Sequence, residues 1–179
     1  MTHKPNIEVL AETKYLQMIQ DAHWTYVRRP NITGAIAVIG VTDDRQVVLI
    51  DQYRIPMQGR VIELPAGLVG DLEDNRDETK EDAARRELLE ETGYEASSIR
   101  AIVNGASSAG LTEEKVHLML ATGLKKVAEG GGDHLEDIIV HTIPLDDVDN
   151  WLAQQIEKGT DVDFKVYAGL YFVKQPMSS

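Results

Sequence analysis

Residues 78–94 read ETKEDAARRELLEETGY, and this stretch predicts a helix with a marked start and a marked end. Thr79 and Asp82 form an S/T-x-x-D/E capping pattern, which is a start signal for helices. Gly93 stands where helices commonly end in a left-handed residue, so the helix is expected to stop there. Between these ends the apolar residues recur at helical spacing: Ala83, Ala84, Leu88 and Leu89.

The predicted helix carries three glutamates on one face, namely Glu87, Glu90 and Glu91. At about 100° per residue, Glu90 lies about 60° to one side of Glu87 and Glu91 about 40° to the other. One interpretation is a solvated acidic face on which Arg86 and Glu90 form an ordinary i,i+4 ion pair. The other is a metal site, because crowded carboxylates need a compensating cation and oxygen ligands suit Mg²⁺ or Mn²⁺.

The full spacing of this stretch resembles the second half of the Nudix box, the signature of the Nudix hydrolase family. The matching positions are Glu78, then seven residues, then Arg86-Glu87-Leu88-x-Glu90-Glu91-x-Gly93-Tyr94. Many positions are specified at set spacing, so the match is far more specific than a lone glycine-rich loop. The resemblance favours the metal site over the solvated face.

One departure from the family pattern lies just before the helix. The family's box opens with a glycine six residues before its first glutamate, and that place is Leu72 here. Gly67, in the run ELPAG, is the natural partner, with ten residues between it and Glu78 where the family has five. We interpret residues 68–77, LVGDLEDNRD, as a loop with a five-residue insertion, because Gly, Asp and Asn favour turns.

Length and composition narrow the class of protein. The chain has 179 residues, the size of one domain with a substantial core. Asp and Glu number 30 against 18 Lys and Arg, and the net charge of -12 argues against a nucleic-acid-binding surface. With no cysteine, disulfides and thiolate chemistry are excluded. We see no signal-peptide core and no run of membrane-spanning length, so the expected location is the cytoplasm, with no membrane partner.

The remaining chain alternates between strand-like and helix-like patterns. Residues 7–29 predict a small antiparallel sheet. Further strands are expected at 32–41, 46–56, 61–67 (ending in a Pro-Ala-Gly turn), 99–105, 115–124 and 137–145. Two helices are expected at 145–159 and 163–175. The apolar stripes of these helices are Leu145, Val148, Leu152 and Ile156, and Val166, Leu170 and Phe172 or Val173. This order of elements predicts a mixed α/β or α+β sandwich.

The resemblance makes the fold prediction more specific. It implies a Nudix fold, in which a mixed β-sheet is sandwiched between helices, over residues 34–179. It also implies that residues 1–33 form the extra N-terminal β-sheet of ADP-ribose and nucleoside-sugar pyrophosphatases. In those relatives the extra sheet builds a homodimer and lends residues to the neighbouring active site, so a homodimer is expected here.

The resemblance also implies a ligand set for the metal. Glu87 and Glu91 would be the main ligands of Mg²⁺ or Mn²⁺, with Glu90 contributing to a second ion. The backbone carbonyl of Ala66, in ELPAG, would join them, although a strand-ending turn is the alternative for this run. Arg86 is interpreted as a residue that orients the carboxylates.

The catalytic residues are expected to be Glu136, Glu90 and Arg86, and the general base lies either outside the helix or among the free carboxylates of the helix. In ADP-ribose-type relatives it lies on a loop before a strand of the EDI kind, which here is GGGDHLEDIIV. This nominates Glu136, with Asp133 and His134 as alternatives. A flexible acidic hairpin loop is the competing interpretation, and the three glycines fit either a closing loop or an inert linker.

Five residues are nominated as substrate contacts. In the QYR element, Arg54 would clamp a phosphate, or it could pair with a local acid. Glu63 would bond a ribose or base, or it could face an arginine. Tyr26 would stack on a base, with core or dimer packing as the alternative. Arg28 would reach a phosphate of the partner subunit's substrate, with solubility of the sheet edge as the alternative. Glu114 ends an element similar to the S-P-G-x-x-x-E of ADP-ribose-specific relatives.

That element indicates the substrate class. Here it reads Ser108-Ala109-Gly110-Leu111-Thr112-Glu113-Glu114, with Ala109 in place of the proline. The departure resembles nucleoside diphosphate sugar hydrolases and favours metal-dependent hydrolysis of sugar nucleotides to a nucleoside monophosphate and a sugar phosphate. A specific ADP-ribose pyrophosphatase is the close alternative. A nucleoside triphosphatase and a non-catalytic nucleotide sensor are more remote.

Overall fold

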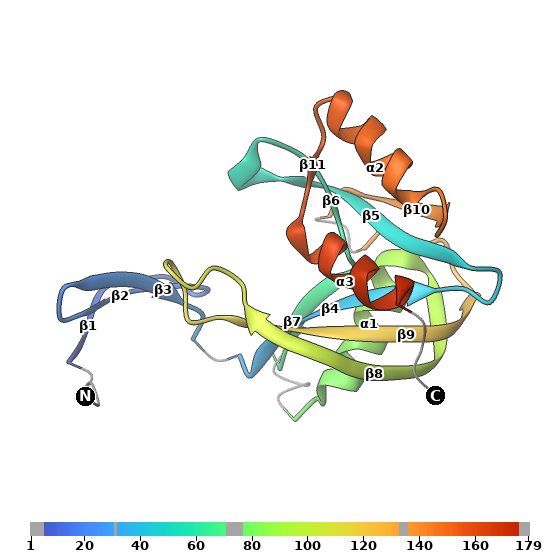
Figure 1. Ribbon diagram of the computed structural model, residues 1–179. Coiled ribbons are helices and arrows are strands. Elements are labelled where there is room, and N and C mark those ends of the chain that lie inside the picture. The colour runs from blue at the N-terminus through green and yellow to red at the C-terminus, as the bar shows by residue number, and fades with distance from the viewer. Residues whose placement is uncertain (1–5, 31, 71–76, 133–135, 176–179) are drawn as a thin grey trace.

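The chain forms a small sheet and a large sheet, with three helices on the large one (Figure 1). The computed structural model describes residues 6–30, 32–70, 77–132 and 136–175. The small antiparallel sheet contains β1 (Ile7–Glu12), β2 (Gln17–Asp21) and β3 (Trp24–Arg28), in that order. The predicted N-terminal sheet is therefore confirmed.

The large sheet is mixed, and its strands run in the order β11-β6-β5-β4-β9-β8, with β10 paired to β5 and β7 paired to β4. The β4–β9 and β6–β11 pairs are parallel, and the other pairs are antiparallel. A short 3₁₀ helix, η1 (Ile55–Met57), separates β5 from β6. The strand bounds are β4 Gly34–Val41, β5 Gln46–Arg54, β6 Gly59–Glu63, β7 Ala66–Val69, β8 Tyr94–Ala106, β9 Lys115–Lys126, β10 Ile138–Pro144 and β11 Asp161–Val162.

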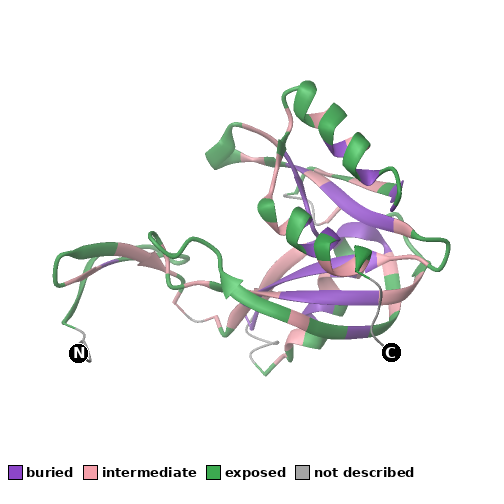
Figure 2. Ribbon diagram, viewed as in Figure 1, coloured by how far each residue is buried: buried purple, intermediate pink, exposed green. Residues whose placement is uncertain are grey.

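The helices cover both faces of the large sheet. The helix α1 (Lys80–Thr92) packs on one face, where Ala83, Ala84 and Leu88 join a buried cluster with Ile36 and Met119. The helices α2 (Val148–Glu157) and α3 (Phe164–Lys174) pack on the other face, and their buried residues are Val148, Leu152, Val166 and Leu170. Figure 2 shows the resulting buried core in the central strands of the large sheet. The predicted mixed sheet between helices is confirmed.

Three local predictions were wrong or incomplete. The expected Pro-Ala-Gly turn and the start of the inserted loop are strand: β7 pairs with β4, with Ala66 opposite Ala37 and Val69 opposite Gly34. Ile156 is 50% exposed and leaves the apolar stripe of α2. The two-residue strand β11 was not predicted, since two residues carry no periodic signal. Residues 71–76 of the inserted loop, with Leu72, lie outside the described residues.

The small sheet projects from the side of the large one (Figure 1). Within its strands Ile19 is the one fully buried side chain, while Ile7, Val9 and Trp24 are 47%, 44% and 52% exposed. Its connection to the body includes a backbone hydrogen bond of 2.8 Å from the Val27 N–H to the Leu111 carbonyl. None of the helices in the described ranges has the length and apolar character needed to cross a bilayer.

Candidate active site

The helix α1 has the ends that its sequence predicts. At its start the Thr79 side chain accepts a hydrogen bond of 3.1 Å from the Asp82 N–H, and Glu81 and Asp82 place negative charge in the first turn. At its end Gly93 is left-handed, with φ 72°, and its N–H donates to the Leu89 carbonyl at 2.8 Å. These caps set where the helix begins and ends, and the buried Ala83, Ala84 and Leu88 set the face that packs on the sheet.

Glu91 is the buried carboxylate of this face, with only 3% of the residue exposed. Its Oε2 accepts a hydrogen bond of 3.0 Å from the backbone N–H of Ala66, at the start of β7. Burial, and after it the neighbouring Glu87 and Glu136 carboxylates, raise the pKa of Glu91 to about 9, while the Ala66 N–H and Arg54 oppose the rise. The pKa of Glu91 is therefore affected by four neighbours: Ala66, Glu87, Glu136 and Arg54.

Glu87 lies directly against Gly67 in β7. A Cβ built on Gly67 would overlap the Glu87 carboxylate, so a glycine is required for this close approach. The carboxylate oxygen nearest to Gly67, Oε1, is held by Arg86, whose Nη1 lies 2.7 Å away. Gly67 was matched in the sequence to the glycine that opens the Nudix box, and this contact was not predicted.

Arg86 links the carboxylates of the Nudix stretch. It binds Glu78 through two nitrogens, with Nε–Oε1 at 3.0 Å and Nη2–Oε2 at 3.1 Å, and Nη2 donates to the Leu68 carbonyl at 3.3 Å. Nη1 also lies 3.4 Å from Oε2 of Glu90, whose side chain is 55% exposed. The hydrogen bonds that Arg86 donates to Glu78 raise the pKa of Arg86, and Glu87 adds to this effect. The i,i+4 pair of the solvated-face interpretation is thus one part of a larger, half-buried network.

The donor set fits a hard divalent cation. Glu87 and Glu91 are one helical turn apart, and the crowding that raises the pKa of Glu91 is relieved when a cation compensates the carboxylates. Within the described ranges no three His, Cys, Asp or Glu side chains form a ready-made metal group. The ligand set of Ala66, Glu87, Glu90 and Glu91 stays a prediction.

Glu136 is far from α1 in the sequence but acts on the same site. It lies two residues before β10, and its charge is one of those that raise the pKa of Glu91. Its side chain lies against Gly132, because a Cβ on that glycine would overlap Glu136 Oε2. The alternative bases, Asp133 and His134, lie outside the described residues.

Arg54 and Glu63 bind each other across β5 and β6. The Arg54 Nη2 lies 2.6 Å from Glu63 Oε2, and the Nε donates to the same oxygen at 2.7 Å. Burial raises the pKa of Glu63, and Arg54 opposes the rise. The alternatives given in the sequence analysis are therefore correct: Arg54 pairs with a nearby acid, and Glu63 faces an arginine. The Arg54 side chain nevertheless remains 41% exposed.

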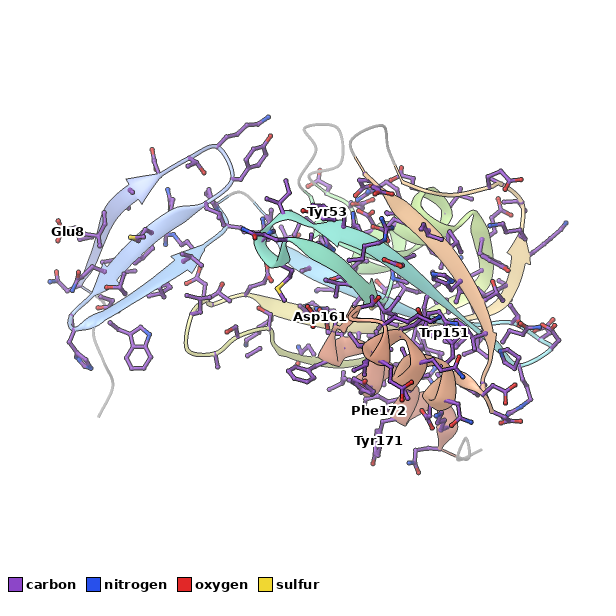
Figure 3. The ribbon with its side chains drawn as sticks, turned by 90° about the horizontal axis from the view of Figure 1, so that it is seen from above. Glu8, Tyr53, Trp151, Asp161, Tyr171 and Phe172 are labelled. Carbon is purple, nitrogen blue, oxygen red and sulfur yellow. The ribbon has the colours of Figure 1, made fainter. Side chains whose placement is uncertain are left out.

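A hollow of about 340 Å³ adjoins this pair. It lies between η1, β6 and the segment that begins with Asp161, which Figure 3 labels beside the helical side of the sheet. Its lining is partly apolar and partly acidic: Arg54, Pro56, Met57, Val61, Glu63, Asp161, Val162 and Asp163. Such a mixture suits the non-phosphate part of a ligand.

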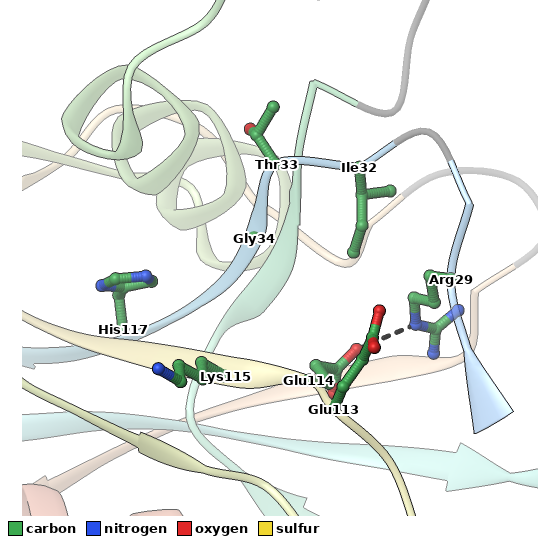
Figure 4. Close-up of a pocket in the computed structure, with 8 residues that line it drawn as sticks. All are labelled: Arg29, Ile32, Thr33, Gly34, Glu113, Glu114, Lys115 and His117. Atoms are coloured by element: carbon green, nitrogen blue, oxygen red, sulfur yellow. Dashed lines mark hydrogen bonds and ion pairs between the residues drawn. The ribbon is translucent and has the colours of Figure 1, made fainter. Parts of the chain in front are cut away.

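The other nominated contacts stand apart from α1. Tyr26 and Arg28 belong to β3, on the projecting sheet, and Arg28 donates through Nε to Gln17 Oε1 at 2.8 Å. Glu114 pairs with Arg29 at 3.0 Å, at a separate hollow of about 260 Å³ that Figure 4 shows next to the start of β9. Within one chain, these residues are not gathered with Glu91.

One set of contacts was missed by the sequence prediction. The last carbonyls of α1 and its cap have no partners within the helix, and the segment 126–132 supplies the donors. The bonds are Gly132 N–H to Glu90, Gly131 N–H to Glu91, Lys126 Nζ to Thr92, and the Val127 and Ala128 N–H groups to Gly93. The sequence did contain a signal for these contacts. The last carbonyls of a helix need hydrogen-bond donors, and this helix has no basic residue in its last turn to supply one.

Comparison with known proteins agrees with this geometry. The sequence matches the NUDIX domain over residues 32–165, so the chain belongs to the Nudix family. It is 38% identical over 120 residues to the methanol dehydrogenase activator of Bacillus methanolicus, covering 65% of this chain and 60% of that protein. It is 38% identical over 96 residues to the ADP-ribose pyrophosphatase of Bacillus subtilis (strain 168), covering 54% and 49%. It is 34% identical over 120 residues to the GDP-mannose pyrophosphatase of Escherichia coli (strain K12), covering 63% and 60%.

The matched part spans between 49% and 60% of the length of these three relatives. A crystal structure of an ADP compounds hydrolase is similar over 83% of this chain and 84% of that chain, with a TM-score of 0.64. Its sequence identity is 20%, so this likeness shows the fold. The predicted family and fold are confirmed.

Proposed function

We propose that this protein is a metal-dependent pyrophosphohydrolase that cleaves the diphosphate bond of nucleoside diphosphate sugars. The observation that carries the proposal is the buried Glu91, held by the Ala66 N–H beside Glu87 and within the field of Glu136 and Arg54. A carboxylate crowded in this way is suited to a divalent cation and a polyanionic substrate. The relatives named as ADP-ribose and GDP-mannose pyrophosphatases support the same reaction class.

In the proposed reaction a water oxygen forms a bond to one phosphorus, and the bridging oxygen leaves with the other phosphate. Glu136 accepts the proton from the attacking water, and the products are a nucleoside monophosphate and a sugar phosphate. A bound Mg²⁺ or Mn²⁺ would neutralise the phosphates and lower the pKa of water. Glu87 and Glu91, with Glu90 and the Ala66 carbonyl, would hold it, and Arg86 orients Glu87.

Arg54 and Glu63 would form the substrate-facing side of the site. Arg54 keeps 41% of its side chain exposed while Glu63 holds its guanidinium, so it can turn a fixed positive charge toward a phosphate. The adjoining hollow would take the nucleoside or sugar. Ala109, in place of the proline of ADP-ribose-specific relatives, favours a broad sugar-nucleotide hydrolase over a strict ADP-ribose pyrophosphatase.

A homodimer and a cytoplasmic location belong to the same proposal. The small sheet exposes Ile7, Val9 and Trp24, and the strand register puts all three on one face with the buried Ile19. A second copy that covers this face would bury apolar area. It would also bring Tyr26, Arg28 or Glu114 to the partner's substrate.

The test is a substrate panel with the purified full-length protein. ADP-ribose, ADP-glucose, UDP-glucose, GDP-mannose and ATP are incubated with Mg²⁺, and released phosphate is measured after coupling to phosphatase. Chelation by EDTA and the Glu91→Gln variant serve as blanks. We expect cleavage of several sugar nucleotides, with loss of the activity in both blanks.

The other outcomes separate the alternatives. Cleavage of ADP-ribose alone would establish the specific pyrophosphatase, and cleavage of ATP alone would establish a triphosphatase. No cleavage of any compound, together with tight nucleotide binding in calorimetry, would establish a sensor. Activity that persists in EDTA would contradict the metal requirement.

A further inference from the structure

The three glycines before Asp133 are docked on the helix that carries the predicted metal ligands. The Gly131 N–H donates to the Glu91 carbonyl at 2.8 Å, and the Gly132 N–H donates to the Glu90 carbonyl at 3.0 Å. The bonds therefore end on the backbone of two nominated ligands. This arrangement differs from both the inert linker and the closing loop that the glycine run suggested.

Glycine is required at two of these three positions for contact reasons as well as for backbone angles. Gly130 has φ 77° and lies so close to α1 that a Cβ would overlap the backbone of Thr92 and Gly93. Gly132 has φ 75° and packs against Glu136, and a Cβ there would overlap that side chain. One glycine thus touches the helix end, and the other touches the nominated base.

We propose that Gly130–Gly132 are positioning residues that hold the Glu136 carboxylate at a set place relative to Glu91. The proposal rests on the function proposed above. The route is short: Glu90 and Glu91 bind the glycine backbone, Gly132 contacts Glu136, and the Glu136 charge acts back on Glu91. Backbone hydrogen bonds hold the glycines on the helix, and the last step is the packing of the Glu136 side chain against Gly132.

The reason that such a device matters is the sensitivity of proton transfer to distance. A general base works only within hydrogen-bond reach of the proton that it accepts. A displacement of about 1 Å costs on the order of 100-fold in rate. An exposed glutamate after a run of glycines would otherwise sample many positions, because glycine restricts the backbone least.

The same segment also stabilises the helix end. The Lys126 Nζ donates to the Thr92 carbonyl at 2.7 Å and to the Glu129 carbonyl at 2.9 Å, so a positive charge sits at the negative end of α1. A purely structural role would be limited to this capping. A positioning role predicts in addition that changes at Gly132 act through Glu136.

The experiment is a double-mutant cycle in the full-length protein, with Gly132→Ala, Glu136→Gln and the double variant. We expect Gly132→Ala to lower kcat by roughly 10- to 100-fold with KM changed by less than about threefold, since the base is displaced while ligand binding remains. In the Glu136→Gln background the same change should cost less than about twofold, because the group that it displaces is already inactive. Gly105→Ala is the control, since a Cβ at Gly105 meets nothing within 4 Å.

A second measurement does not depend on activity. Amide hydrogen exchange, resolved by NMR, should show the Gly131 and Gly132 N–H groups protected in the wild type. In Gly132→Ala the amide at position 132 should lose this protection. Unprotected amides would overturn the proposal. Equal losses of kcat from Gly132→Ala in both backgrounds would also overturn it.

These outcomes are separable from a failure of the proposed function. If the wild type hydrolyses no sugar nucleotide, the function fails and the exchange data still report on the docked glycines. If the wild type is active and Glu136→Gln keeps full activity, the positioning proposal fails and the hydrolase proposal stands.

Discussion

The C-terminal end of α1 and the small sheet β1–β3 differ sharply in how they are held. The helix end is fixed from three directions: β7 contacts Glu87 and Glu91, Arg86 binds Glu78, and the glycine segment fills its carbonyls. The small sheet has a single fully buried side chain, Ile19, and leaves Trp24 52% exposed. The helix end is therefore held in place by contacts within its own chain, whereas the small sheet makes few tertiary contacts with the rest of the chain.

This difference indicates what each region is for. The face of the small sheet that holds the buried Ile19 leaves Ile7, Val9 and Trp24 about half exposed, and exposed apolar faces of this kind suit contacts with another protein. The α1 site needs rigid placement, because its chemistry depends on the distances between charged groups. The comparison therefore agrees with the proposals made above, in which the domain formed by the large sheet and its helices carries out the reaction and the small sheet contacts a second copy of the chain.

Removal of residues 1–30 is expected to have the largest effect on oligomeric state and activity. We expect the truncated chain to be monomeric and inactive, because the partner's sheet would complete each site, while the body keeps its core and its helical circular dichroism. Light scattering after size exclusion and the sugar-nucleotide assay measure both effects. In the full chain, Trp24→Lys should weaken the dimer in the same direction. A fully active monomer would refute the shared site.

Glu91→Gln tests the buried carboxylate within the body. We expect activity to fall on the order of 10³-fold, since a ligand is lost from the metal that would stabilise the transition-state charge. The metal-free variant should nevertheless melt a few degrees higher, because the pKa of Glu91 is raised to about 9 and the carboxyl must take up a proton on folding at neutral pH, a cost that glutamine removes. Kinetics with Mg²⁺ and melting in EDTA measure the two effects. Glu81→Gln, at an exposed position of the same helix, is the control, and a lower melting temperature for Glu91→Gln would contradict this account.

Gly67→Ala tests the close contact between β7 and α1. The added Cβ overlaps the Glu87 carboxylate, so we expect activity to fall roughly 10- to 100-fold and stability to fall by about 1–3 kcal/mol. Gly59→Ala is the matched control, since its Cβ would lie 3.7 Å from its nearest neighbour, the Met57 carbonyl oxygen. Wild-type kinetics in Gly67→Ala would show that the position of Glu87 is unimportant.

Thr79→Ala should have the smallest effect. Loss of the hydrogen bond from the Asp82 N–H to the Thr79 side chain costs about 1 kcal/mol, or about 2–4 °C in melting temperature, with kcat unchanged. Thr25→Ala, at an exposed position of the small sheet, should stay within about 0.5 kcal/mol of the wild type. Equal effects at the two positions would remove the contrast between the two regions.

Much of the fold was predictable because its signals are local. Thr79 and Gly93 mark the ends of α1, and runs of apolar, largely β-branched residues mark the central strands β4 and β5. The errors lie where local and long-range effects compete. The ELPAG run has a turn-like composition, yet Ala66–Val69 is a strand because its backbone pairs with β4. Ile156 has helical spacing, yet it is exposed because the core ends before that turn of α2.

The sequence by itself determined the Nudix family, the helix with its three glutamates, and the charge that argues against nucleic acid as a partner. These properties follow from residue identity and spacing, which need no information about distant neighbours. Tertiary structure alone decided that Arg54 binds Glu63, that Gly67 receives Glu87, and that Gly131 and Gly132 dock on α1. Such contacts join residues far apart in the chain, so they exist only once the strands are ordered in the sheet and α1 is packed on its face.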